Sequence, residues 1–193
     1  IILVLLTFIQ CQKTDRKFDL RNGDIIFQRS MQPQHLVMSF LDISFYNHCG
    51  VIIIFDDEYY VISAEKTVTY TPLKEWISRG ASKKYQIMRP QKEWQNEINS
   101  FLRQARFYKG KIYDFQYTWD DKKIYNSELI QKAFYKSNNV YLGEFIKVTG
   151  VSVPPQDSTL FKSCEQFVPY NKEIVTVNAL MNSPYLKNFI FKK

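Results

Sequence analysis

The chain has 193 residues, a length that suits one compact domain. Hydrophobic residues make up 45% and charged residues 23%, which excludes a disordered or fibrous chain. The net charge of +7 comes from basic residues spread along the chain. No nucleic-acid-binding motif accompanies them, so we expect no nucleic-acid partner. Three cysteines without a C-x-x-C pair, two histidines and few glycines predict no disulfide framework, no metal site and no cofactor.

Residues 1–17 are interpreted as a signal peptide or lipoprotein leader. Residues 1–9 (IILVLLTFI) form an apolar run that is too short for a membrane-spanning helix, which needs about 20 residues, but fits the h-region of a secretory signal. No Met and no basic segment precede the run, so we expect the natural start to lie upstream. Cys11 follows, as at a bacterial lipoprotein cleavage site, although residues 8–10 (FIQ) are not the small residues preferred there. The segment predicts export to the periplasm or cell envelope, with Cys11 lipidated as a membrane anchor. The alternative is a buried N-terminal strand with an incidental cysteine.

From residue 18 onward, the pattern predicts one α+β domain spanning residues 18–193. An Asn-Gly turn precedes an apolar strand at 25–27, and the β-branched run HCGVIIIF at 48–55 is typical of a central strand buried on both faces. Helices are typical of 93–108, where apolar residues recur at helical spacing, and of 128–136. Strands that precede helices favour an α+β fold. The remaining expected elements are a short helix within 31–46, strands at 59–64, 67–70 and 85–88, a helix at 72–77 ended by Gly80, and a loop-rich segment after Gly150.

Five strings occur in a fixed order along residues 18–135. They are 23–28 (GDIIFQ), 48–51 (HCGV), 61–64 (VISA) followed by 70–73 (YTPL), Trp76 and 79–80 (RG), 110–114 (GKIYD), and 125–130 (YNSELI). Together they resemble the YiiX/YaeF-like permuted papain-like amidases, relatives of the NlpC-type cell-wall peptidases and the lecithin-retinol acyltransferases. The resemblance implies a permuted papain-like (NlpC-type) fold with an antiparallel sheet packed against helices.

The resemblance also implies a cysteine nucleophile at a helix N-terminus, a histidine on a strand and a polar residue that orients the histidine. A helix N-terminus favours a thiolate, and a neighbouring histidine takes or gives the proton. His48 matches the family's H-x-G-[VI] histidine. The nucleophile of the family's Y-C-S-E-L-V string is replaced by Asn126, and the orienting glutamate of V-[IL]-E-A is replaced by Ser63. The side chain of Asn126 cannot act as an ionisable nucleophile, and we expect it to cap a helix beginning at Ser127.

The sequence offers other candidates for the missing groups. Ser127 is rotated about 100° along the helix from Asn126, and Glu65 lies two residues beyond Ser63 on the same strand face. Cys49 neighbours His48 on its strand, so their side chains point to opposite faces and Cys49 is more typical of a small core residue. Cys164 lies in the loop-rich segment.

Three functions remain open. The first is an exported papain-like domain that has lost cysteine catalysis and binds a small-molecule, peptide or acyl ligand in a groove between His48 and Asn126. The second is an active amide or ester hydrolase with a non-standard nucleophile such as Ser127. The third is a basic surface-binding protein without enzymatic activity.

Overall fold

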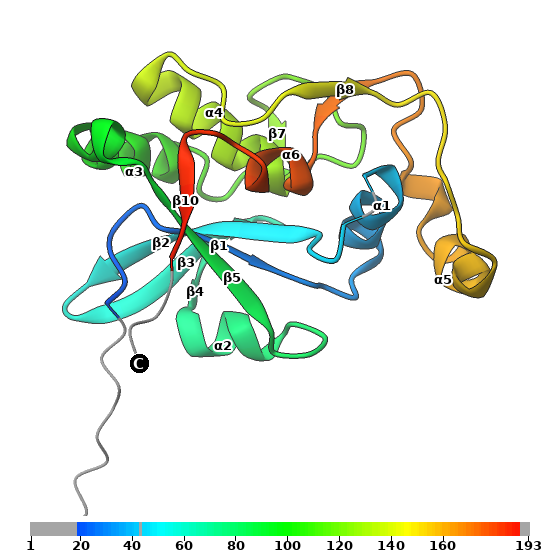
Figure 1. The fold of residues 1–193 in the computed structure, drawn as a ribbon, viewed down its shortest axis with the longest axis horizontal. Helices are drawn as coiled ribbons and strands as arrows, with labels where there is room; N and C mark the ends of the chain where they lie inside the picture. The colour runs from blue at the N-terminus through cyan, green and yellow to red at the C-terminus, as the bar shows by residue number, and fades with distance from the viewer. Residues whose placement is uncertain (1–18, 43, 190–193) are drawn as a thin grey trace, which may run out of the picture.

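An antiparallel sheet of six strands in the order β10-β5-β1-β2-β3-β4 lies at the centre of the computed structural model (Figure 1). The structure describes residues 19–42 and 44–189, so the leader proposed for 1–17, including Cys11, lies outside the described residues. The strands of this sheet are β1 (Ile25–Gln28), β2 (His48–Phe55), β3 (Glu58–Ala64), β4 (Val68–Pro72), β5 (Tyr85–Pro90) and β10 (Leu186–Asn188).

Strand β2 lies in the middle of the sheet, as its β-branched run predicted. It pairs with β1 on one side, where Ile25 faces Val51, and with β3 on the other. Its first six residues are buried. Gly23, at the turn before β1, has a φ of +85°, a backbone conformation that L side chains rarely adopt, so glycine is required there. The expected Asn-Gly turn therefore fixes the start of β1 against β2.

Helices cover the two faces of the sheet unequally (Figure 1). On one face α3 and α4 bury Phe101 and Phe134 against the sheet, and on the other α2 buries Trp76. No helix within the described ranges is long and apolar enough to cross a membrane. The helices are α1 (Pro33–Leu41), α2 (Leu73–Ser78), α3 (Ile98–Phe107), α4 (Asn126–Asn138), α5 (Ser158–Lys162) and α6 (Val177–Met181).

The segment after α4 returns to the sheet through short elements, as the prolines after Gly150 predicted. Strand β10, which we did not expect, ends this segment and joins the main sheet beside β5. Two small sheets lie outside the main one: a parallel sheet (β6 with β7) before α4 and an antiparallel sheet (β8 with β9) after it. The short elements of the chain are β6 (Ile112–Tyr113), β7 (Lys123–Ile124), β8 (Phe145–Lys147), β9 (Glu173–Val175), and the 3₁₀ turns η1 (Lys92–Glu97), η2 (Pro155–Asp157) and η3 (Glu165–Phe167).

The single helix expected over 93–108 is divided in the structure. Its first part winds as the 3₁₀ turn η1, and only α3 is α-helical. Trp94 packs edge-on against Phe134 at 6.0 Å and Tyr185 at 5.6 Å between ring centroids. Neither η1 nor α3 has a side-chain cap that would fix an α-helical start. We infer that the packing of Trp94 sets the path of this segment and overrides its helical periodicity.

A buried ion pair joins the start of β1 to β5. The Arg89 guanidinium donates two hydrogen bonds to the Asp24 carboxylate, from Nε at 2.7 Å and from Nη2 at 2.8 Å. The side chains of Asp24 and Arg89 are 1% and 8% exposed. Arg89 also donates to the backbone carbonyl of Asp19 at 2.9 Å. Removal of either charge leaves the other buried without an opposite charge.

We expect Asp24→Asn to lower the free energy of unfolding by roughly 3–5 kcal/mol, the usual cost of breaking a buried ion pair. Urea denaturation followed by circular dichroism measures this loss. The matched control is Glu75→Gln, which removes an exposed partner of Arg79 and should cost less than about 1 kcal/mol. Equal losses for the two variants would show that the Asp24–Arg89 pair does not hold the sheet together.

Candidate active site

His48 opens β2, and its imidazole lies in a stack of rings from three elements. The His35 ring of α1 lies parallel to it, with centroids 4.1 Å apart and an interplanar angle of 13°. The Trp76 ring of α2 lies on the His48 ring at 5.1 Å and 29°. His35 and His48 are 0% and 2% exposed. The sequence analysis had singled out His48 but not His35.

Both histidines are held in their neutral form by their surroundings. Neither ring nitrogen of His48 has a hydrogen-bond partner, and burial, followed by the nearby His35, lowers the pKa of His48 well below 6.5, while the Ala64 backbone opposes this in part. Nδ1 of His35 lies 3.0 Å from the hydroxyl oxygen of Ser30. Burial lowers the pKa of His35 to about 3. At neutral pH the pair carries no charge, and His48 retains a free lone pair.

Asn126 is the first residue of α4, which corrects the expected cap position. The helix begins one residue earlier than expected, and its N-cap is Tyr125. The Asn126 Oδ1 still accepts a hydrogen bond from the first turn, from the backbone N–H of Ser127 at 2.6 Å. Its Nδ2 donates to the backbone carbonyl of Asn47 at 3.1 Å. The fully buried amide therefore joins the helix N-terminus to the residue that precedes His48.

A continuous set of polar contacts leads from this amide to the stacked histidines. The Asn47 side chain accepts from the backbone N–H of Ser30 at 2.7 Å and donates to its carbonyl at 3.0 Å. The hydroxyl of Ser30 in turn contacts His35. All of these groups are buried. Asn126 thus reaches the histidine pair through Asn47 and Ser30, and no hydrogen bond joins it to the His48 ring.

Ser63 lies on β3, and its hydroxyl is engaged by Trp76. The indole Nε1 of Trp76 donates to Ser63 Oγ at 3.0 Å, while its ring stacks on His48. A Cβ added at Gly50 of β2 would lie 3.1 Å from Cβ of Ser63, which places Ser63 beside the histidine strand. Ser63 thus supports the ring that packs on His48.

An acid that replaced the orienting glutamate would have to contact the imidazole of His48, but Glu65 contacts Arg79 instead. Its carboxylate accepts two hydrogen bonds from Arg79, at 2.9 and 3.0 Å. Arg79 also donates to Glu75 at 2.5 Å. The carboxylate of Glu65 is therefore paired with a guanidinium rather than with an imidazole.

Each remaining candidate nucleophile is either hydrogen-bonded to the backbone or buried with a raised pKa. The hydroxyl of Ser127 donates to the carbonyl of Val175 at 2.8 Å. Cys49 is fully buried in the core, as expected, and burial raises the pKa of its thiol. Cys164 is also buried, and its pKa is raised to about 11, chiefly by desolvation. Neither of these thiols has the lowered pKa of a reactive cysteine.

Metal ligation by these residues has little geometric support. Within residues 19–42 and 44–189, no three His, Cys, Asp or Glu side chains are placed to hold a metal ion. The two histidines stack nearly parallel, and because the lone pairs of an imidazole lie in the ring plane, parallel rings do not direct them toward one point.

A buried charge pair behind the start of α4 was also missed by the sequence analysis. Glu128 accepts from the Tyr125 backbone N–H at 3.1 Å and pairs with Lys132 at 2.8 Å. Burial raises the pKa of Glu128 to about 8, against the opposing effect of Lys132. A glutamate three residues after an N-cap is the signal that could have revealed this pair, once Tyr125 is recognised as the cap.

The antiparallel sheet, the histidine on its central strand and the helix starting beside that strand are the arrangement of a papain-like hydrolase domain in which the histidine precedes the nucleophile position. The family described as "Permuted papain-like amidase enzyme, YaeF/YiiX, C92 family" matches residues 19–190, and the chain belongs to this family. This confirms the resemblance and the fold class expected from the motifs.

Two relatives support the assignment. The uncharacterized protein YiiX of Escherichia coli strain K12 is 32% identical over 169 residues, which cover 86% of this chain and 84% of the relative. The crystal structure of yiiX from Escherichia coli O157:H7, described as a metalloprotein, superposes with a TM-score of 0.77 at 29% identity. It covers 89% of this chain and 97% of its own.

The buried histidines make a pH-dependent contribution to stability. A histidine whose pKa is lower in the folded than in the unfolded chain binds fewer protons when folded, so the free energy of unfolding falls as the pH drops below about 6.5. We expect His35→Phe to reduce this slope by up to about 1.4 kcal/mol per pH unit between pH 6 and pH 5. Urea denaturation at several pH values measures it, and an unchanged slope would mean that His35 titrates as it does in the unfolded chain.

Proposed function

We propose that this family member does not hydrolyse its ligand but binds it, and that the ligand is a small molecule or peptide with an amide or acyl group. The observation that carries the proposal is the amide of Asn126 at the N-terminus of α4. The family's motif has its cysteine at this position. An amide has no ionisable nucleophile, and both ends of this one are already hydrogen-bonded.

The neighbouring groups support the same proposal. A nucleophile needs a base that can accept its proton, and the neutral His48 is suited to that task. Ser127, however, directs its hydroxyl to Val175 rather than to a histidine. The unpartnered ring nitrogens of His48 are suited instead to a hydrogen bond with the polar group of a ligand. Because His48 and Asn126 are buried, a ligand would reach them only after local opening.

No metal enters this proposal. The relative of known structure is described as a metalloprotein, but the described residues of this chain bring no three ligating side chains together. We therefore assign the binding role to His48 and its polar surroundings alone.

Restoration of a thiol at position 126 tests the proposal. In Asn126→Cys, the N-terminus of α4 should favour a thiolate, and the neutral His48 should favour it further by accepting the thiol proton. These effects oppose the rise in pKa that burial causes, and we expect them to hold the thiol pKa below the ordinary value of about 8.5. The absorbance of the thiolate, titrated against pH and corrected for the parent protein, measures this pKa without requiring access of an alkylating reagent. An activated ester such as p-nitrophenyl acetate should acylate the variant but not the parent protein, as read by intact mass.

The controls separate the roles of the neighbouring residues. Adding His48→Ala to Asn126→Cys should raise the thiol pKa and slow acylation, whereas adding Ser63→Glu should increase reactivity if the glutamate orients His48. Hydrolysis need not return for the test to succeed. A folded Asn126→Cys protein whose new thiol titrates at or above 8.5 and is not acylated would contradict the proposed nucleophile position.

We also propose that the protein is exported to the periplasm or cell envelope and carries a lipid on Cys11. The support is the apolar run of residues 1–9 followed directly by Cys11. Expressed with its natural start in a bacterial host, the protein should be recovered in the membrane fraction and should incorporate labelled palmitate. Cys11→Ser should release it from the membrane fraction, and Cys164→Ser should not. Equal recovery of all three proteins would exclude a lipid anchor at Cys11.

A further inference from the structure

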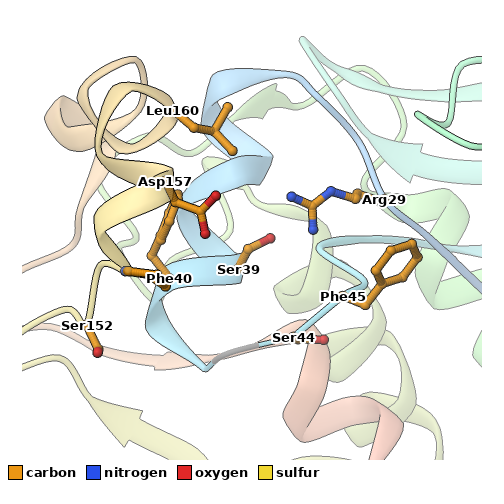
Figure 2. Close-up of a pocket in the computed structure, with 9 residues that line it drawn as sticks. Arg29, Ser39, Phe40, Ser44, Phe45, Ser152, Asp157 and Leu160 are labelled. Atoms are coloured by element: carbon orange, nitrogen blue, oxygen red, sulfur yellow. The ribbon is translucent and has the colours of Figure 1, made fainter.

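A cavity of about 270 Å³ opens beside α1 (Figure 2), and neither of the stacked histidines lines it. Its walls come from segments far apart in the chain: the residue that follows β1, helix α1, the loop before β2, and the segment from Ser152 to Leu160. Its volume lies just below the range of about 300–1,000 Å³ typical of sites for drug-sized ligands. The cavity therefore suits a smaller molecule.

Two oppositely charged side chains face this cavity without forming an ion pair with each other. Figure 2 shows the guanidinium of Arg29 and the carboxylate of Asp157 pointing into it from opposite walls. In the part of the chain that the structure describes, neither of them takes part in an ion pair. Asp157 occupies the N-cap position of α5, yet its side chain makes no capping hydrogen bond. Both groups are therefore available to a ligand.

The other walls add a hydroxyl and an apolar surface. The hydroxyl oxygen of Ser39 is buried without a hydrogen-bond partner, and in Figure 2 it points toward Arg29. Phe40, Phe45 and Leu160 supply apolar surface. The guanidinium of Arg29 lies over the Phe45 ring at 5.6 Å from its centroid, which restricts its position. The cavity thus combines a positioned cation, an anion, an unused hydroxyl and apolar walls.

We propose that this cavity binds a small zwitterion, an α-amino acid with an apolar side chain. A simple anion would pair with Arg29 but would face the carboxylate of Asp157, and a simple cation would face Arg29. A zwitterion satisfies both, because its carboxylate fits the planar fork of the guanidinium and its ammonium group donates to Asp157. The apolar side chain then packs on the phenylalanines. This inference does not depend on the proposed loss of hydrolysis, because neither His48 nor Asn126 lines the cavity.

Calorimetric titration of the full chain with L-leucine tests the assignment. N-acetyl-L-leucine lacks the ammonium group and L-leucinamide lacks the carboxylate, and each should bind at least about tenfold more weakly, since each loses a hydrogen bond to a charged group. Arg29→Gln should weaken leucine but leave leucinamide little changed. Asp157→Asn should weaken leucine but leave N-acetyl-leucine unchanged or tighter.

Matched controls separate the cavity from general charge effects. Arg103→Gln and Glu144→Gln neutralise charges of the same two signs at exposed residues outside the cavity and should bind leucine as the parent protein does. Absence of leucine binding at millimolar concentration would overturn the proposal. N-acetyl-leucine bound as tightly as leucine would show an anion site instead, and leucinamide bound as tightly would show a cation site. Failure here, with a reactive thiol in Asn126→Cys, would leave the proposed function intact.

Discussion

The side-chain amide of Asn126 joins the two elements on which the centre of this molecule depends. One end accepts from the first turn of α4, and the other donates to the carbonyl of Asn47 at the entrance to β2. Asn47 holds Ser30, which contacts His35. Under our proposal, position 126 is where the family's motif has its cysteine, and in this chain the side chain at that position connects a helix to a strand.

The same arrangement explains why the centre is closed. His48 lies between His35 and Trp76, and the latter is fixed by its hydrogen bond to Ser63. Stacked rings exclude water, and burial disfavours the charged imidazolium. The closed centre thus combines His48 with neighbours that keep it neutral and buried.

The open polar cavity lies beside α1 and is lined by neither His35 nor His48. Arg29 precedes Ser30 of the buried network, and Ser39 follows His35 by one helical turn, so both cavity walls are continuous with the elements that hold the histidines. Ligand binding in the cavity would therefore act on the same helix that covers His48. The buried Asp24–Arg89 ion pair joins β1 to β5 in the sheet beneath these elements, and Glu128 contacts Lys132 within α4.

Local sequence patterns predicted most of the helices and strands, because each pattern depends only on residues within one element. The β-branched run placed His48 on a central buried strand, and the order of the motifs located Asn126 at the start of a helix, one residue from the observed boundary. The division of the 93–108 helix was missed because Trp94 packs against distant residues.

The features of the candidate site that the sequence analysis missed also depend on contacts between distant segments of the chain. His35 lies in a segment with mixed character, and its importance comes from a ring on another element. Arg29 and Asp157 line the same cavity only because the segment that leads into α5 packs beside α1. Strand β10 is three residues long and is stabilised by its pairing with β5, so its own sequence carries little signal.

The most direct measurement is turnover of a panel of amide, ester and thioester substrates by the parent protein, His48→Ala and Ser127→Ala, side by side. The account predicts that all three give the same background rate, because no described side chain in the site provides an activated nucleophile. Turnover by the parent protein that His48→Ala abolishes would contradict it, and loss of that turnover in Ser127→Ala would identify the nucleophile.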